Sequence, residues 1–147
     1  MIKIDDRSTK LLGRRGEDLA AAFLHENGYR IIIRNFKVPV GRNRKGVSVS
    51  GEIDIIALDG ETLCFIEVKT RRSESFVPIT KNIDLRKQRQ IIRTSKVYRR
   101  LFDLFETPVR YDAVTVLLNE IDKPRVELLR AFFTGSAFRE RRRKNFE

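Results

Sequence analysis

Two acids and a lysine lie close together in a segment that alternates between apolar and charged residues, GEIDIIALDGETLCFIEVKTR at 51–71. The Asp-Gly pair at 59–60 is a strong signal for a two-residue hairpin turn, so the segment predicts two antiparallel strands. Counting back from this turn places Asp54 opposite Phe65. Glu67 then lies on the neighbouring diagonal, at a Cα distance of roughly 7–8 Å from Asp54. Two carboxylates can meet across that gap.

Strand side chains point alternately to the two faces of a sheet. The charged residues of the hairpin share one face: Glu52, Asp54, Glu67 and Lys69. An apolar set occupies the other face: Ile53, Ile55, Cys64, Ile66 and Val68. The charged face also becomes apolar nearer the turn, so we expect both faces to be covered by other elements.

Like charges that are buried together raise the pKa of one group or recruit a cation. Mg²⁺ is usually held by one or two carboxylates together with water and phosphate oxygens, and Asp54 and Glu67 could supply those carboxylates to Mg²⁺ or Mn²⁺. The metal would activate a water and bind a phosphate. Lys69 could position that water or neutralise developing charge. The alternative is an edge hairpin whose charges form solvated ion pairs.

Residues 12–27 predict an amphipathic helix that ends before Gly28. Glu17 falls inside its apolar arc, so an acid points inward, and Gly13 and Gly16 share that face, where missing side chains would let the helix approach the sheet. The alternative is that Glu17 only complements the helix dipole.

An ordered set of residues surrounds these candidates: Gly13, Gly16-Glu17, Gly28-Tyr29, Arg34-Asn35, Gly51-Glu52-Ile53-Asp54 and Phe65-Ile66-Glu67-Val68-Lys69-Thr70-Arg71. From about Leu12 to Phe133 the chain resembles the YraN-like family of uncharacterised bacterial proteins. That family is similar to the restriction-endonuclease-like PD-(D/E)XK nucleases, including archaeal Holliday-junction resolvases.

The resemblance implies roles for the candidate residues. Asp54 matches the motif aspartate, Glu67 the second acid and Lys69 the lysine. Glu17 matches the helix-borne glutamate of the resolvases and is expected to hold the metal together with Asp54 and Glu67. Lys87 matches a lysine that would contact phosphate. Ile53 stands where the superfamily motif has proline. The family usually passes from Arg-Asn to Gly-Glu-Ile-Asp quickly, whereas here residues 37–50 intervene.

The other segments predict an α/β fold with a restriction-endonuclease-like αβββαβ core, in which helices flank a mixed central sheet. Strands are expected at 29–36, 110–118 and 126–133 in addition to the hairpin. A helix is expected at 84–105, with an inner stripe of Ile91, Tyr98, Leu101, Phe102 and Phe105. We expect a single domain over 1–147, with a basic tail from about 137.

The formal charge of +11, from 31 basic and 20 acidic residues, favours nucleic acid as the partner. Candidate phosphate contacts are Arg71 and Arg72 directly after the hairpin, Arg42, Arg44 and Lys45 in a loop before it, and Arg139, Arg141, Arg142, Arg143 and Lys144 in the tail. No apolar run approaches the roughly 18 residues that span a bilayer, and no signal segment is evident, so we expect a cytoplasmic protein without a membrane partner.

Cys64 is expected in the core and His25 at the surface, which argues against zinc or a histidine triad. Together these features predict a divalent-metal-dependent nuclease that hydrolyses DNA phosphodiester bonds, with branched or single-stranded DNA as candidate substrates. The alternative is a catalytically inactive nucleic-acid-binding module with the same fold. A third reading, docking on ribosomes or acidic membranes, gives the inward Glu17 no role. The Phe-rich stretches 102–105 and 132–138 could support a homodimer.

Overall fold

The computed structural model describes residues 6–72, 83–119 and 123–135. The elements follow the order α1 (Asp6–Glu26), β1 (Arg30–Arg42), β2 (Ser48–Asp59), β3 (Thr62–Arg71), α3 (Leu85–Leu101), β4 (Val109–Leu117) and β5 (Arg125–Phe133). The five strands form one sheet in the order β1-β2-β3-β4-β5. All neighbouring strands are antiparallel except β3 and β4, which are parallel. The expected mixed α/β architecture is therefore confirmed.

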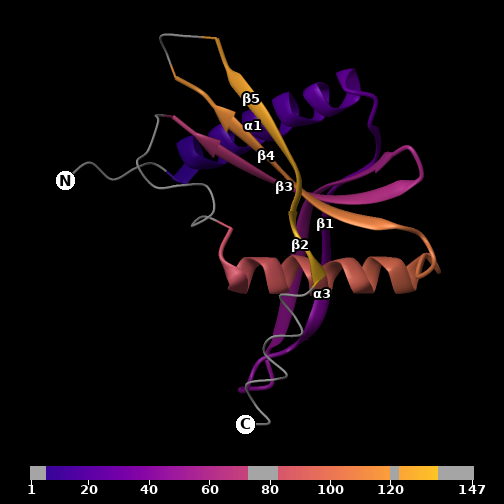
Figure 1. The fold of residues 1–147 in the computed structure, drawn as a ribbon. Helices are drawn as coiled ribbons and strands as arrows, with labels where there is room; N and C mark the ends of the chain where they lie inside the picture. The colour runs from indigo at the N-terminus through magenta and orange to yellow at the C-terminus, as the bar shows by residue number, and fades with distance from the viewer. Residues whose placement is uncertain (1–5, 73–82, 120–122, 136–147) are drawn as a thin grey trace.

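Helices α1 and α3 cover opposite faces of the sheet (Figure 1). Ala20, Ala21 and Leu24 of α1 pack on Ile55, Cys64, Ile66, Val68 and Val114. On the other face Ile91, Ile92 and Tyr98 of α3 pack on Ile56, Leu63, Phe65 and Tyr111. Parallel strands need a crossover connection, and here the segment that contains α3 supplies it. The hairpin β2–β3 is thus enclosed between two hydrophobic layers.

Glycines let both helices approach the sheet closely. A Cβ on Gly16 of α1 would lie 1.8 Å from Thr70 Oγ1 of β3, and a Cβ on Gly51 of β2 would lie 1.9 Å from Thr94 Oγ1 of α3. The expected close approach is correct for Gly16. It is wrong for Gly13, where an added Cβ would meet nothing within 4 Å.

The turn between β2 and β3 differs from the predicted one. Asp59 pairs with Thr62, so Gly60 and Glu61 form the turn, with Gly60 at φ 60°. Leu58 therefore pairs with Leu63 instead of facing Glu61. The register moves by two residues, which changes the cross-strand partners but keeps each side chain on its predicted face.

Ile53 is an exception to that rule. It was expected with Ile55 on the α1 face, but it packs in the α3-side core opposite Phe36. Strict alternation breaks beside Asn35 of β1, which adopts a left-handed conformation at φ 55°. Such a residue increases the local twist of a strand pair.

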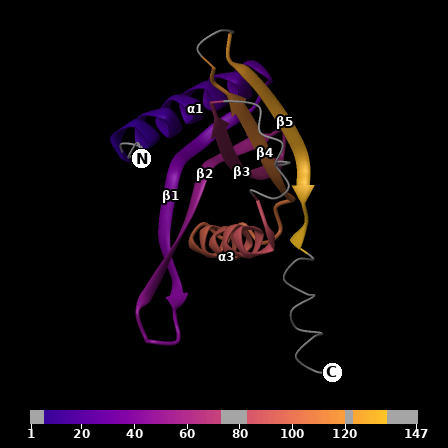
Figure 2. The same ribbon diagram turned by 90° about the vertical axis from the view of Figure 1, so that its left-hand side faces the viewer.

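The inserted segment 37–50 is not a loop. It extends β1 and β2 into a long hairpin, and we call this outer part, residues 37–50, the arm. Figure 2 shows the arm reaching past helix α3. Its turn is ordered by the Asn43 side chain, which accepts hydrogen bonds from the backbone N–H groups of Lys45 at 2.9 Å and Val47 at 3.0 Å. The expected strand 29–36 is therefore lengthened to Arg42.

Both helices differ in length from the predictions. Helix α1 begins at Asp6, before the expected residue 12, and α3 ends at Leu101, before the expected residue 105. The chain turns at Asp103, which has φ 52°, so the helical periodicity does not continue.

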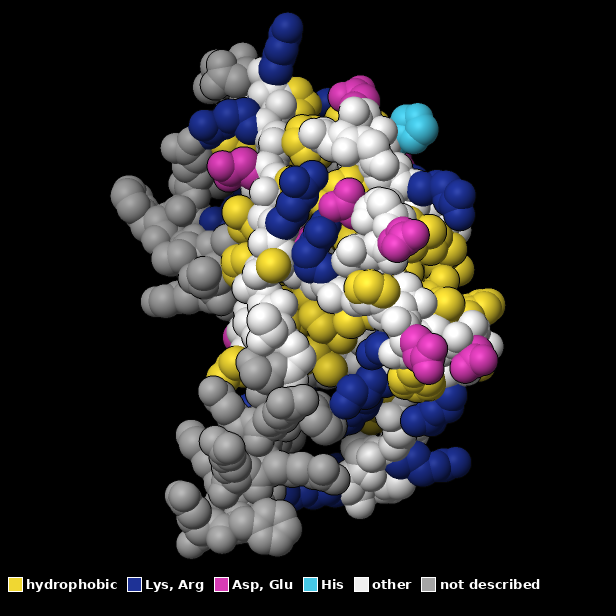
Figure 3. All heavy atoms as spheres, turned by 45° about the vertical axis from the view of Figure 1, so that its right-hand side comes forward, with side chains coloured by type: hydrophobic (Ala, Val, Ile, Leu, Met, Phe, Trp, Pro, Cys, Tyr) yellow, Lys and Arg dark blue, Asp and Glu magenta, His cyan; other side chains and the backbone are white. Residues whose placement is uncertain are grey.

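As a result, three residues of the predicted inner stripe are at the surface: Leu101 is 61%, Phe102 58% and Phe105 50% exposed. Figure 3 brings this side of the molecule forward and shows hydrophobic side chains among charged ones.

Candidate active site

The first candidate acid, Asp54, lies where the β2–β3 pairing ends. Backbone pairing runs from Asp59 and Thr62 to Ile55 and Ile66. One step further along β2, Asp54 Oδ2 accepts a hydrogen bond of 2.8 Å from the backbone N–H of Val68. A side-chain oxygen here takes the place of a backbone acceptor. This bond orients the carboxylate of Asp54 toward the strand that carries the second acid.

Glu67, the second candidate acid, is buried at 4% exposure and contacts two lysines. Lys69 Nζ lies 3.3 Å from Glu67 Oε1, and Lys87 Nζ lies 3.6 Å from the same oxygen. Lys69 comes from the same strand, whereas Lys87 comes from the first turn of α3. The structure therefore brings Lys87 to the acids, where the family resemblance expected a lysine.

Burial, and after it the charge of Glu67, raise the pKa of Asp54 from its ordinary 3.8 to about 8. The Val68 N–H and Lys87 act in the opposite direction, and Glu17 adds a smaller repulsion. Asp54 therefore holds a proton near neutral pH when no cation is bound. A cation between these oxygens would relieve the repulsion that raises this pKa.

Glu17, on α1, is half-buried, and this burial raises its pKa. Arg34 and a hydrogen bond from the Asn35 side chain oppose that rise, while Glu52 adds repulsion. The inward position predicted for Glu17 is thus observed. The Arg34-Asn35 pair that formed part of the resemblance supports this glutamate from β1, and Arg34 also donates to Asp18 at 2.7 Å.

The donor set around Asp54 suits a hard divalent cation, because carboxylate oxygens are the ligands that Mg²⁺ prefers. No group of three or more His, Cys, Asp and Glu side chains within residues 6–72, 83–119 and 123–135 is arranged to hold a metal ion. The predicted set of three acids with Glu17 is thus not assembled among the described residues. Asp54 and Glu67 would need water and phosphate oxygens to complete a metal site.

The remaining basic candidates are spread over several surfaces. Arg71 lies two residues after Lys69 on β3, and the guanidinium of Arg72 donates to Ser8 Oγ of α1 at 2.6 Å. Arg42 donates to the Gly46 carbonyl at 2.8 Å within the arm. Arg44 and Lys45 are exposed at the turn of the arm. The basic tail lies outside the described residues.

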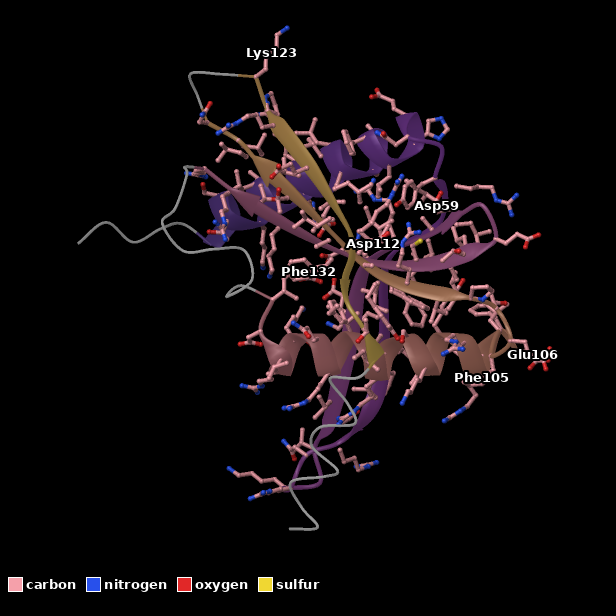
Figure 4. The ribbon with its side chains drawn as sticks, in the orientation of Figure 1. Asp59, Phe105, Glu106, Asp112, Lys123 and Phe132 are labelled. Atoms are coloured by element: carbon pink, nitrogen blue, oxygen red, sulfur yellow. The ribbon has the colours of Figure 1, made fainter. Side chains whose placement is uncertain are left out.

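Sequence reasoning missed a second polar cluster, centred on the fully buried Asp112 (Figure 4). Its carboxylate accepts from Arg110 Nε at 2.9 Å, from Tyr29 Oη at 3.2 Å and from the Ala131 N–H at 2.9 Å. Arg110 also donates to Asp59 at 2.8 Å. These bonds satisfy the buried carboxylate and connect β4 to β5, to the end of β2 and to Tyr29 just before β1. The only signal in the sequence was an aspartate inside an apolar strand.

The prediction that Cys64 is buried and His25 exposed is confirmed. No helix in the described part of the chain is long and apolar enough to cross a membrane.

Comparisons with known proteins identify the family of this chain. The chain is 40% identical over 121 residues to a UPF0102 protein of Chlorobium limicola, which covers 82% of this chain and 86% of the relative. It is 39% identical over 118 residues to UPF0102 protein GSU0650 of Geobacter sulfurreducens, which covers 80% of this chain and 84% of the relative. A solved structure titled "Crystal structure of SSO0001" is 15% identical, with a TM-score of 0.40 over 95% of this chain and 60% of that one.

Residues 16–116 match the family model described as "Uncharacterised protein family UPF0102". That range contains Glu17, Asp54, Glu67, Lys69 and Lys87. The chain therefore belongs to the UPF0102 family.

Proposed function

We propose that this protein is a divalent-metal-dependent nuclease that hydrolyses DNA phosphodiester bonds at Asp54 and Glu67. The observation that carries the proposal is the meeting of these two carboxylates at the open end of the β2–β3 pairing, with two lysines beside them. Placing these two acids together is costly in a structural role, because burial and the charge of Glu67 raise the pKa of Asp54 to about 8.

Asp54 and Glu67 would hold Mg²⁺ or Mn²⁺, and Glu17 on α1 would add to the negative field that attracts the cation. When bound, the metal supplies a Lewis acid that activates water and neutralises phosphate charge. The Val68 N–H keeps Asp54 oriented. Lys69 lies close enough to Glu67 to stabilise negative charge that develops on the phosphate.

The test is cleavage of end-labelled duplex, single-stranded and four-way-junction DNA with Mg²⁺ or Mn²⁺. We expect Asp54→Asn and Glu67→Gln to lose cleavage while DNA binding is retained. Glu127→Gln, which changes an exposed acid on β5, is the matched control and should cut like the parent. Cleavage that persists in either site variant would contradict the assignment.

One observation favours a second candidate function. Lys69 and Lys87 both lie within 4 Å of Glu67 Oε1, at 3.3 and 3.6 Å, so the charge of Glu67 is compensated within the chain. A nucleic-acid-binding module that keeps the fold but does not cut would have the same arrangement. DNA binding without cleavage under any metal condition would favour that function.

A further inference from the structure

A groove of about 630 Å³ lies between helix α3 and the arm. Its α3 side carries four basic residues, Arg86, Lys87, Arg89 and Arg93. Asp84 is the one acid among the described residues that line the groove, and it caps α3 by accepting a hydrogen bond of 2.9 Å from the Lys87 N–H. The charge of the groove is therefore strongly positive.

The walls of the groove are held at a fixed separation. Gln90 of α3 donates to the Ser50 carbonyl of β2 at 3.3 Å. A Cβ on Gly51 would collide with Thr94 of α3 and Val40 of β1, so only glycine permits this close packing. At the base of the groove, α3 is thus packed closely against the β1–β2 hairpin.

Lys87 connects the groove to the candidate active site, because it lines the groove and also lies 3.6 Å from Glu67 Oε1. We propose that the groove binds the sugar–phosphate backbone of a single nucleic-acid strand that continues from the phosphate at the two acids. This inference rests on the proposed function and gives the arm a role in it.

The chemistry of the lining favours a strand backbone over other polyanions. Among the described residues that line the groove there is no aromatic side chain on which bases could stack, and the apolar ones are Val40 and Val49, so contact is expected with phosphates and not with bases. A concave site suits a flexible strand better than the flat surface of a membrane. Arg86 and Arg93, both exposed, have no acidic partner among the described residues.

The test is fluorescence anisotropy of a labelled single-stranded DNA with full-length protein in EDTA, so that no cleavage occurs. The double variant Arg86→Gln/Arg93→Gln removes two groove charges. The control Arg30→Gln/Lys123→Gln removes two exposed charges: Arg30 pairs with Leu58 near the β2–β3 turn, and Lys123 points away from α3 (Figure 4).

We expect the groove variant to bind roughly tenfold more weakly and its salt slope to fall by about 1.4, since each phosphate contact on a single strand contributes about 0.7. The control should bind like the parent. Single-stranded RNA should show a similar loss, because phosphates are contacted. Equal affinity of the groove variant and the control would overturn the inference.

The inference would also be overturned if the groove variant lost binding to phosphatidylserine vesicles but bound DNA as the parent does. Failure of the proposed function is distinguished by the metal-dependent cleavage assay on the parent. If the groove variant loses binding and the parent never cuts, the strand-binding groove is supported and the nuclease function is contradicted. If the parent cuts and the groove variant binds normally, the nuclease function is supported and the strand-binding groove is contradicted.

Discussion

Asp54→Asn removes the charge of the candidate acid but can keep its hydrogen bond with the Val68 N–H. Asparagine keeps an oxygen that can accept from the Val68 N–H, as Asp54 does at 2.8 Å, but it cannot ionise. The variant therefore leaves the strand pair closed and removes the buried negative charge. Its effect on the free energy of unfolding should depend on pH.

The sign follows from the pKa of Asp54, which is about 8 in the folded chain against an ordinary 3.8. Near pH 4 the folded state keeps the proton and the unfolded state begins to lose it, so the free energy of unfolding falls as pH rises toward 8. At 1.36 kcal/mol per pH unit the upper limit is about 6 kcal/mol. Lys87 can move and water can enter at the strand end, so we expect a loss of about 1–3 kcal/mol.

The assay is urea unfolding followed by circular dichroism at pH 4.5, 6 and 8 in EDTA, repeated with Mg²⁺ or Mn²⁺. Asp54→Asn should be about as stable as the parent at pH 4.5 and more stable by about 1–3 kcal/mol at pH 8. Metal should stabilise the parent and not the variant, because only a ligand that binds the folded state raises stability. Glu127→Gln is the control. A difference that does not change with pH, or a variant that is less stable throughout, would refute the reasoning.

Three further predictions concern packing and burial. Gly16→Ala should lower the free energy of unfolding by about 1–3 kcal/mol because its Cβ collides with a threonine on β3, whereas Gly13→Ala should be neutral or stabilising by about 1 kcal/mol; urea unfolding of the pair isolates the contact. Asp112→Ala should cost about 3–5 kcal/mol because it leaves the Arg110 guanidinium without its buried partner, and a melting temperature equal to that of the parent would contradict this. Burial raises the pKa of Cys64 to about 12, so a thiol reagent should modify it at pH 8 only as fast as the chain unfolds, and rapid labelling of the native protein would show that the thiol is accessible.

The elements that position the site were predictable because their patterns are local. Alternation in the hairpin placed Asp54 and Glu67 on the same face of the sheet, and helical periodicity placed Glu17 on the inner face of its helix. The hairpin turn was predicted one residue too early, but the resulting shift of two residues preserved the faces. Local pattern therefore located the acids even where the exact pairing was wrong.

Features that depend on contacts between distant segments could not be read from the sequence. The cluster around Asp112 joins residues from β4 and β5 with Tyr29, which precedes β1, and no single segment signals it. The insertion 37–50 carries glycines and basic residues typical of a loop, yet each half finds a partner in the other and forms the arm. The approach of α3 to Gly51 also depends on the tertiary fold.

The length of the arm sets a distance scale for any strand bound along it. The extended part of the arm in β2, from Gly51 to Ser48, is about 10 Å long at roughly 3.3 Å per residue, and the turn at 43–47 follows it. Nucleotides in a helical strand rise about 3.4 Å each, so this length corresponds to about 3 nucleotides. The arm would thus set the length of strand that the groove contacts. Substrates with fewer nucleotides than this on the arm side of the reacting phosphate would lose contacts one by one as they are shortened, and relatives without the insertion would have a shorter footprint.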